Sequence, residues 1–181
     1  MQIIQLVKSY AAGRRDFREV DFRETWMPGV NLEGAVLQGA DLTGGNLSHS
    51  CLRQVDFSRA MLWRTNLAYA DLRGAAFERA TLIRCQLERC DLRGACFTDA
   101  DLRLAELSYV NLTGACLKNV QLCYANLVKA NLAGIDFRTV DLTGANLSGA
   151  NVSGSQFTSA QLEYLSPQGM VSHDAVRPMA V

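Results

Sequence analysis

The sequence predicts an all-β solenoid in which the chain turns every five residues and winds into stacked, four-sided coils. Two observations predict this fold. A large apolar residue occupies every fifth position from Phe17 to Leu162, thirty positions without an insertion or deletion. Six of the seven phenylalanines, at positions 17, 57, 77, 97, 137 and 157, are separated by multiples of 20. A period of five fits neither a strand, which alternates every two residues, nor a helix, whose period is 3.6.

Each five-residue unit has the pattern A(D/N)LxG, centred on the large apolar residue. A small or β-branched residue such as Ala80 stands two positions before the centre, and Asp or Asn stands one position before it in 17 of the 30 units. Asp and Asn side chains bond local backbone amides and favour turns, and glycine accepts the positive φ of the third residue of a type II turn. Each unit is therefore expected to form one short strand and one corner.

A period of 20 residues means four units per coil and a square cross-section. A column of glycines has the same spacing, at positions 34, 74, 94, 114, 134 and 154. Thirty units predict about seven and a half coils, which stack as parallel β-bridges about 4.8 Å apart. The β-helix is expected to occupy residues 14–164, with no α-helix within 17–162.

The two ends are expected to differ from the repeats, because an uncovered solenoid end exposes its core and its strand edges. Ile3, Val7, Tyr10 and Ala11 share one face of a helix that Gly13 can end. Residues 1–13 are therefore predicted to form a capping helix. Residues 165–181 contain two prolines and few large apolar side chains, which predicts an irregular C-terminal tail.

In these motifs the chain resembles the pentapeptide repeat proteins, whose unit A(D/N)LxG covers residues 15–164. It is most similar to the cyanobacterial branch and to its heterocyst-regulating members. The segments that carry this similarity are YAAGRRDF (10–17), CLRQVDFSRAMLW (51–63) and GMVSHD (169–174). The resemblance implies a right-handed quadrilateral β-helix and a scaffold that binds another protein.

Composition is that of one water-soluble domain. The chain has 181 residues, a formal net charge of zero and 49% hydrophobic residues. It has no apolar run of the roughly 18 residues that a membrane span needs. The apolar run at the N-terminus is short and contains Gln5 and Lys8, which is unlike a signal peptide. These features predict a cytoplasmic protein without a membrane partner, either a monomer or a weak homodimer.

The six cysteines predict no metal or cofactor site. Cys85 and Cys90 occupy the small inward position, where a free cysteine packs as a small apolar residue. Cys96 and Cys116 are 20 residues apart and should stack on neighbouring coils, close enough for a disulfide. In a cytosolic protein two reduced thiols are expected instead. The only histidines, His49 and His173, complete no zinc-ligand pattern.

Catalysis is not predicted either. The carboxylates mostly occupy the turn position of the repeat, no nucleophile–base pair is suggested by spacing, and no phosphate-binding glycine loop is present. A filled, narrow coil also leaves no interior cavity for a substrate. Function is therefore expected on the outer faces, without an enzyme activity or a cofactor.

Three kinds of partner remain open at this point. The first is another protein. The second is a type II topoisomerase, bound by mimicry of DNA as in pentapeptide repeat proteins of the quinolone-resistance type. The third is nucleic acid itself. Mimicry needs an acidic rod, whereas the outward positions of the middle coils carry nine arginines, at 53, 59, 64, 73, 79, 84, 89, 93 and 103. Zero net charge and the absence of a basic tail disfavour nucleic acid.

A protein-binding surface is predicted where outward residues of three adjacent columns are large. The ten residues of this surface, named here the aromatic–cation patch, are Trp63, Arg64, Tyr69, Ile83, Arg84, Arg89, Arg103, Leu104, Tyr109 and Tyr124. Cys123 and Lys129 complete the three columns. Stacking every 20 residues should bring them together, and Trp, Tyr and Arg are enriched in interface hot spots.

Overall fold

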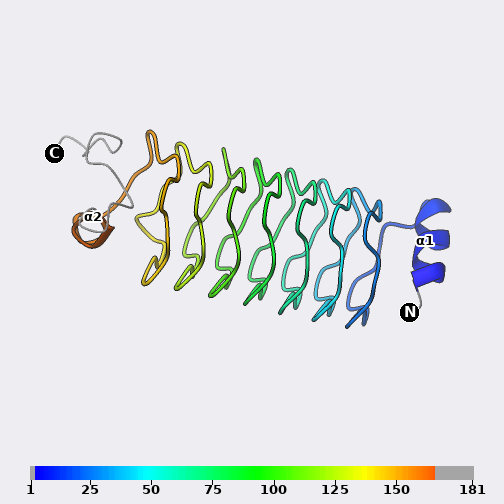
Figure 1. The fold of residues 1–181 in the computed structure, drawn as a ribbon. Coiled ribbons are helices and arrows are strands. Elements are labelled where there is room, and N and C mark those ends of the chain that lie inside the picture. Colours follow the sequence, from blue (N-terminus) through cyan, green and yellow to red (C-terminus); the bar gives the residue numbers. More distant parts are fainter. Residues whose placement is uncertain (1–2, 166–181) are drawn as a thin grey trace.

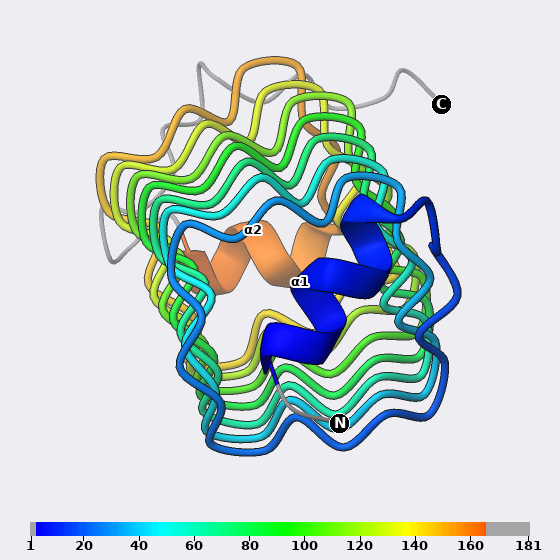
Figure 2. The same ribbon diagram turned by 90° about the vertical axis from the view of Figure 1, so that its right-hand side faces the viewer.

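The computed structural model describes residues 3–165, which form a rod of stacked coils between two short helices (Figure 1). Helix α1, Ile3–Ala11, lies at one end of the rod and helix α2, Ser159–Leu165, lies at the other. Viewed along the rod, successive coils superimpose in a four-sided outline (Figure 2). Within residues 3–165 no helix is long and apolar enough to cross a membrane.

Neighbouring coils pair through single-residue parallel bridges, each joining residues 20 apart, from Asp16↔Val36 to Asp136↔Gln156. This register confirms the predicted coil of four units. At Cys96, for example, the backbone N–H donates to the carbonyl of Ala75 at 3.0 Å, while its own carbonyl accepts from Phe77 at 2.7 Å. The strands stay this short because the chain turns again within five residues.

The core is the stack of large central residues that the period predicts. Every central residue of a unit, from Phe17 to Val152, is at most 4% exposed. The rings of Phe57, Phe77 and Phe97 form a continuous stack, with centroid separations of 5.3 and 4.7 Å. Since the coils lie one strand spacing apart, identical residues in one column meet face to face, and the interior is filled along the rod.

The smaller inward position also behaves as predicted. Cys85 and Cys90 are buried, and their thiols donate to the carbonyls of Thr65 at 3.1 Å and Leu67 at 2.9 Å. Burial raises the pKa of Cys90 to about 12 and that of Cys85 well above its ordinary value. These two thiols therefore stay protonated and serve as packing groups.

The corners confirm the predicted role of the Asp and Asn residues. In a representative unit, Oδ1 of Asp56 accepts from the backbone N–H of Ser58 at 2.8 Å. The third turn residue has positive φ, as at Gly34, where it is 65°. Sixteen residues other than glycine adopt the same left-handed conformation, which the repeat pattern alone did not predict.

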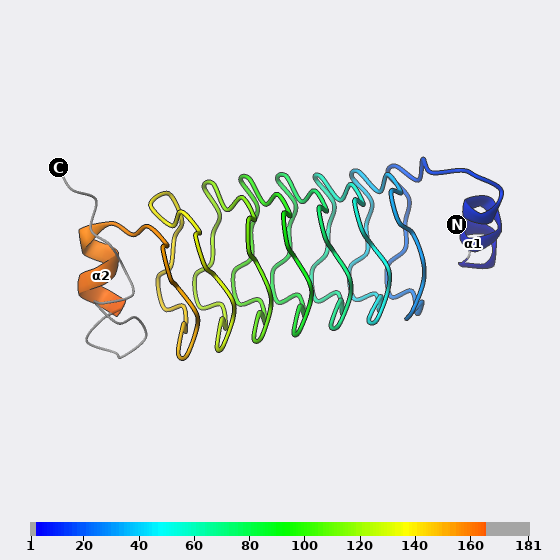
Figure 3. The same cartoon turned by 90° about the horizontal axis from the view of Figure 1, so that it is seen from above.

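Both ends of the solenoid are covered by helices (Figure 3). Helix α1 lies where the sequence predicted a short helix, and its Leu6 is fully buried against the core. The prediction of no helix within residues 17–162 is wrong at the C-terminal end, since α2 begins at Ser159. Bridged units therefore end at Gln156, seven coils of 20 residues after Asp16, rather than continuing to residue 164.

The physical reason for α2 is a local capping box. Thr158 Oγ1 accepts from the backbone N–H of Gln161 at 3.2 Å, and Gln161 Oε1 accepts from the backbone N–H of Thr158 at 2.8 Å. This reciprocal arrangement satisfies backbone donors at a helix start and favours helix over another repeat. Leu165, the last residue of α2, is buried in the core cluster. The predicted irregular tail beyond it lies outside the described residues.

Candidate interaction surface

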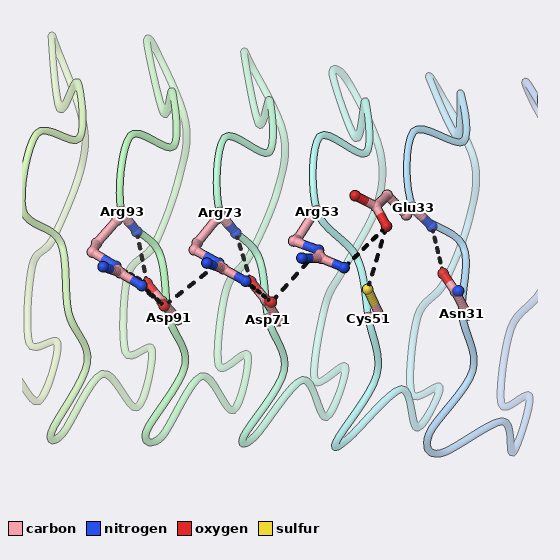
Figure 4. Close-up of polar contacts among 8 residues, drawn as sticks. All are labelled: Asn31, Glu33, Cys51, Arg53, Asp71, Arg73, Asp91 and Arg93. Carbon is pink, nitrogen blue, oxygen red and sulfur yellow. Dashed lines mark hydrogen bonds and ion pairs between the residues drawn. The ribbon is translucent and has the colours of Figure 1, made fainter.

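One corner of the rod carries a ladder of alternating charges that runs along four coils (Figure 4). Its members are Glu33, Arg53, Asp71, Arg73, Asp91 and Arg93. Arg73 shows the pattern, since its Nη2 lies 2.6 Å from Asp71 Oδ2 and its Nε lies 3.7 Å from Asp91 Oδ2 on the next coil. The ladder contains three acids and three arginines, so this corner carries no net charge.

Hydrogen bonds from the arginines also hold the ladder's aspartates in the ionised form. The side chain of Arg73 lowers the pKa of Asp71, and that of Arg93 lowers the pKa of Asp91. At the N-terminal end of the ladder, Cys51 replaces the aspartate that would pair with Arg53. Arg53 instead reaches Glu33 on the preceding coil at 3.1 Å.

Most of the nine arginines that the sequence placed on the middle coils are compensated in this way. Arg103 bonds Asp101 at 2.7 Å, Arg79 lies 3.7 Å from Asp99, and Arg89 lies 3.5 Å from Glu88. Of these nine, Arg59, Arg64 and Arg84 have no ion-pair partner within residues 3–165. The surface therefore offers neither a run of free cations for phosphates nor a run of free carboxylates that would resemble DNA.

The aromatic–cation patch lies on two other, adjacent corners. All ten of its residues belong to these corners, so the structure brings together the set that the sequence selected. Its large apolar side chains remain in solvent, and Trp63, Tyr69, Leu104, Tyr109 and Tyr124 are each at least 40% exposed. Ile83 is half-buried between its neighbours. Arg84 and Arg64 are the uncompensated cations of the patch.

On the first of these corners, cations and rings lie against each other. The guanidinium of Arg64 is 4.5 Å from the Trp63 ring centroid. The ring of Tyr124 lies over Gly144 on the next coil, where a Cβ would fall 2.4 Å from a ring carbon. Glycine at position 144 thus leaves the space that the tyrosine ring occupies.

The second corner carries two groups of stacked side chains. The rings of His49 and Tyr69 are parallel within 8°, with centroids 4.9 Å apart. Further along, Arg89 lies 4.5 Å and Lys129 lies 5.5 Å from the Tyr109 ring centroid. His49 extends the patch by one coil. The sequence analysis did not include it, although it shares the 20-residue spacing of Tyr69.

A polar strip separates the two corners. It consists of the outward strand residues Asn66, Gln86, Glu106 and Asn126. Asn126 Nδ2 donates to both carboxylate oxygens of Glu106, at 3.0 and 2.8 Å, and the Ser108 backbone N–H donates to Oε1 at 3.0 Å. Glu106, the one acid of this strip, is therefore already engaged within the protein.

The backbone conformation of the patch is unusual for its residue types. Seven of its ten residues occupy the third turn position with φ between 55° and 62°, namely Arg64, Tyr69, Arg84, Arg89, Leu104, Tyr109 and Tyr124. A residue with a Cβ pays about 1–2 kcal/mol in this region, whereas glycine does not. Large side chains therefore stand where glycine would be less strained.

Within residues 3–165 no three His, Cys, Asp or Glu side chains are grouped so that they could hold a metal ion. The groups that the patch presents to solvent are ring faces and guanidinium groups, beside the amide side chains of the polar strip.

A four-sided solenoid built of A(D/N)LxG units defines a class of repeat protein. The family profile described as pentapeptide repeats matches eight copies, over residues 16–54, 56–94, 85–122, 121–158 and 136–164. The chain belongs to the pentapeptide repeat family.

Solved structures of the same family include proteins from several sources. The chain is 31% identical to HetL of the cyanobacterium Nostoc sp. strain PCC 7120, a protein involved in heterocyst differentiation regulation. That match covers 86% of this chain and 81% of HetL, with a TM-score of 0.45. The similarity to a heterocyst-regulating member, expected from the sequence, is thus confirmed.

Two further structures of pentapeptide repeat proteins also match this chain. A trypsin-treated form of QnrB1, a plasmid-mediated fluoroquinolone resistance protein, is 18% identical with a TM-score of 0.58, covering 87% of this chain and 93% of QnrB1. A pentapeptide repeat protein of the Arabidopsis thaliana thylakoid lumen is 33% identical with a TM-score of 0.34, covering 62% of this chain and 71% of its own. No curated protein sequence matches the chain.

Proposed function

We propose that this protein is a non-enzymatic interaction module that binds another protein through the aromatic–cation patch. The observation that carries the proposal is the set of seven large side chains at left-handed turn positions, gathered on two adjacent corners. Strain of this kind is maintained where the side chain itself is needed, and it concentrates at functional sites.

The chemistry of the patch supports a protein partner. Its exposed rings offer apolar area with little side-chain entropy to lose, and Arg64 and Arg84 keep free guanidinium groups beside them. Such a surface fits a partner that presents apolar side chains together with carboxylates. The proposal assigns the protein to the cytoplasm, which is in keeping with its six free cysteines.

The alternative, a DNA mimic that binds a type II topoisomerase, finds less support. A mimic presents uncompensated negative charge along the rod, whereas Asp71, Asp91 and Asp101 are each paired with an arginine. The similarity to QnrB1 at 18% identity concerns the fold. A supercoiling assay with DNA gyrase, in which this protein leaves the enzyme's activity unchanged, would separate the two functions.

The proposal is tested by capture of partners from an extract of the source cells with the Trp63→Ala, Tyr109→Ala double variant. Both rings lie on the outside, so the fold should be unchanged by circular dichroism, and partner capture should fall at least tenfold because hot-spot residues contribute about 2 kcal/mol or more each. Trp26→Ala is the matched control, since Trp26 is 70% exposed and lies outside the patch. Light scattering of both variants shows whether the partner is a second copy of this chain. Unchanged capture and unchanged oligomeric state in the double variant would refute the proposal.

A further inference from the structure

The ladder of bridges between coils is interrupted at one place. Bridges join every consecutive pair of equivalent units from Asp16 to Gln156, 24 in all, except between Cys116 and Asp136. Among the described residues, the backbone N–H groups of Leu117 and Asp136 have no backbone acceptor there. A shallow surface cavity of about 420 Å³ opens at this gap, lined by residues of both coils, including Cys116, Lys118 and Asp136.

The gap has a local cause in the sequence. Thr139 is the one third-turn residue between Glu19 and Gly154 that does not adopt positive φ. A β-branched side chain is especially disfavoured in the left-handed region, so this corner takes another conformation. The Thr139 hydroxyl then accepts from the Asn119 backbone N–H at 3.1 Å, where other units use a backbone carbonyl.

Two thiols lie beside this gap, on the side where the Cys116 strand is still bridged to the preceding coil. Cys96 and Cys116 face each other across a parallel bridge, and the Thr98 hydroxyl lies between them, 3.4 Å from one sulfur and 3.5 Å from the other. Cys116 is exposed and Cys96 is half-buried. A hydrogen bond from Thr98 lowers the pKa of Cys116, and the backbone N–H of Lys118 acts in the same direction. A stabilised, accessible thiolate is the form that reacts with oxidants.

The gap also gives the Cys116 strand freedom to approach Cys96. Stacked side chains on parallel strands are about 4.8 Å apart, whereas the Cβ atoms of a disulfide lie about 3.8 Å apart. On the Cys96 side the strand is held by Cys116 N–H to Ala95 O at 2.9 Å and Phe97 N–H to Cys116 O at 2.8 Å. On the other side its bridge is missing, so it can move toward Cys96 without breaking a bridge.

We propose that Cys116 is a peroxide-reactive thiol and that Cys96 is its resolving partner. The Cys116 thiolate attacks a hydroperoxide, the O–O bond breaks, and the products are a sulfenic acid at Cys116 and an alcohol or water. The Cys96 sulfur then attacks the sulfenic sulfur, the S–O bond breaks, and a disulfide and one water molecule are formed. Two thiols are oxidised by two electrons in total, and one hydroperoxide is reduced.

The test is a titration of the reduced protein with hydrogen peroxide, followed by alkylation and tryptic digestion without reductant. Cleavage at Arg103 separates the peptides 94–103 and 104–118, which carry one cysteine of the pair each. After oxidation we expect these two peptides to be joined by a disulfide, and dithiothreitol should separate them again. Cys96→Ser should leave a Cys116 sulfenic acid that dimedone traps, and Cys116→Ser should leave Cys96 reduced.

Two controls decide the roles of the pair and of the gap. Cys51 is half-buried at the same position of its unit but has Asn31 and Asp71 on the neighbouring coils, so it should stay reduced while the pair is oxidised. Thr139→Gly should restore the left-handed corner and slow disulfide formation several-fold. Oxidation of Cys51 as fast as Cys116, or failure of the linked peptide to form in the parent, would overturn the proposal. A linked peptide that forms equally fast in Thr139→Gly would overturn the role of the gap.

Discussion

At the scale of single residues, the third turn position decides what each corner presents. Where it is glycine, as at Gly74, Gly94 and Gly114, the corner is bare and the backbone is relaxed. Where it is Tyr109 or Arg84, the same backbone holds a large side chain in solvent. One conformation therefore yields both bare corners and corners with large exposed side chains, and only the residue type distinguishes them.

At Gly144 a glycine corner lies directly beside a corner with a large side chain. Because Gly144 has no Cβ, the Tyr124 ring fits over it. We expect Gly144→Ala and Gly134→Ala to lower the free energy of unfolding by a similar amount, about 1 kcal/mol, since both positions have positive φ. Only Gly144→Ala should displace the Tyr124 ring, because a Cβ at Gly134 meets no atom within 4 Å. Urea denaturation measures the first effect.

Partner capture measures the second effect. It should weaken in Gly144→Ala and remain at the parental level in Gly134→Ala. Equal capture by both variants would show that the position of Tyr124 does not matter for binding.

At the scale of the structural elements, the charge ladder joins neighbouring coils. Asp71 and Asp91 each contact an arginine of their own unit and one of the preceding coil. Their folded-state pKa values lie below the ordinary value, so folding favours the ionised form. The stabilisation is fully present above that ordinary value and is lost as the pH falls through the lowered pKa.

Because the pKa values of Asp71 and Asp91 are lowered, the protein should lose stability in acid, and replacement of these aspartates by asparagine should reduce that loss. Between about pH 5 and about pH 2 the urea midpoint of the parent should fall more than that of an Asp71→Asn, Asp91→Asn variant. Asparagine keeps the local turn bond, as Asn111 does by accepting from the Thr113 backbone N–H at 3.1 Å. Parallel pH profiles for the two proteins would mean that the ladder contributes nothing to stability.

The repeat pattern predicted the core and the outward placement of the patch residues, because both follow from periodic position. Phe77 is buried and Trp63 is exposed for the same reason, their place within the five-residue unit. Features that depend on one residue breaking the pattern were not predicted. Thr139 interrupts the ladder of bridges, and the Thr158–Gln161 capping box replaces the last unit by α2. Thr139 and the Thr158–Gln161 pair are both present in the sequence. They do not interrupt the five-residue spacing of large apolar residues, so the period alone does not reveal them.

The pairing of the arginines was harder to predict. Sequence position showed that Arg73 and Arg103 lie outside the core, but not that each bonds the aspartate two residues before it. This pairing depends on the corner geometry, which turns both side chains to the same side. Charge counting alone therefore overstated how many cations are available to a partner.

At the scale of the whole molecule, the rod stays finite because helices cover both of its ends. Any coil could template another, since its backbone donors and acceptors point along the rod. At the C-terminal end Gln161 Nε2 donates to the carbonyls of Phe137 and Val140, both at 2.9 Å. The Val140 carbonyl is the one that a further coil would otherwise have used, as Val120 accepts from the Asp141 N–H at 3.0 Å, whereas the Phe137 carbonyl also accepts from the Val140 N–H of its own turn.

Gln161→Ala should therefore loosen the C-terminal cap. The Val140 carbonyl loses its donor, while the Phe137 carbonyl keeps the Val140 N–H, and this loss should lower the free energy of unfolding by about 1–2 kcal/mol. An exposed last coil should also promote end-to-end association, seen as a concentration-dependent increase in mass by light scattering. Gln121→Ala is the matched control, because Gln121 lies in the same column two coils earlier and its side chain is exposed on the flank of the rod. If the two variants have equal stability and equal mass at every concentration, α2 does not protect the end, and the last coil must be kept from pairing by other means.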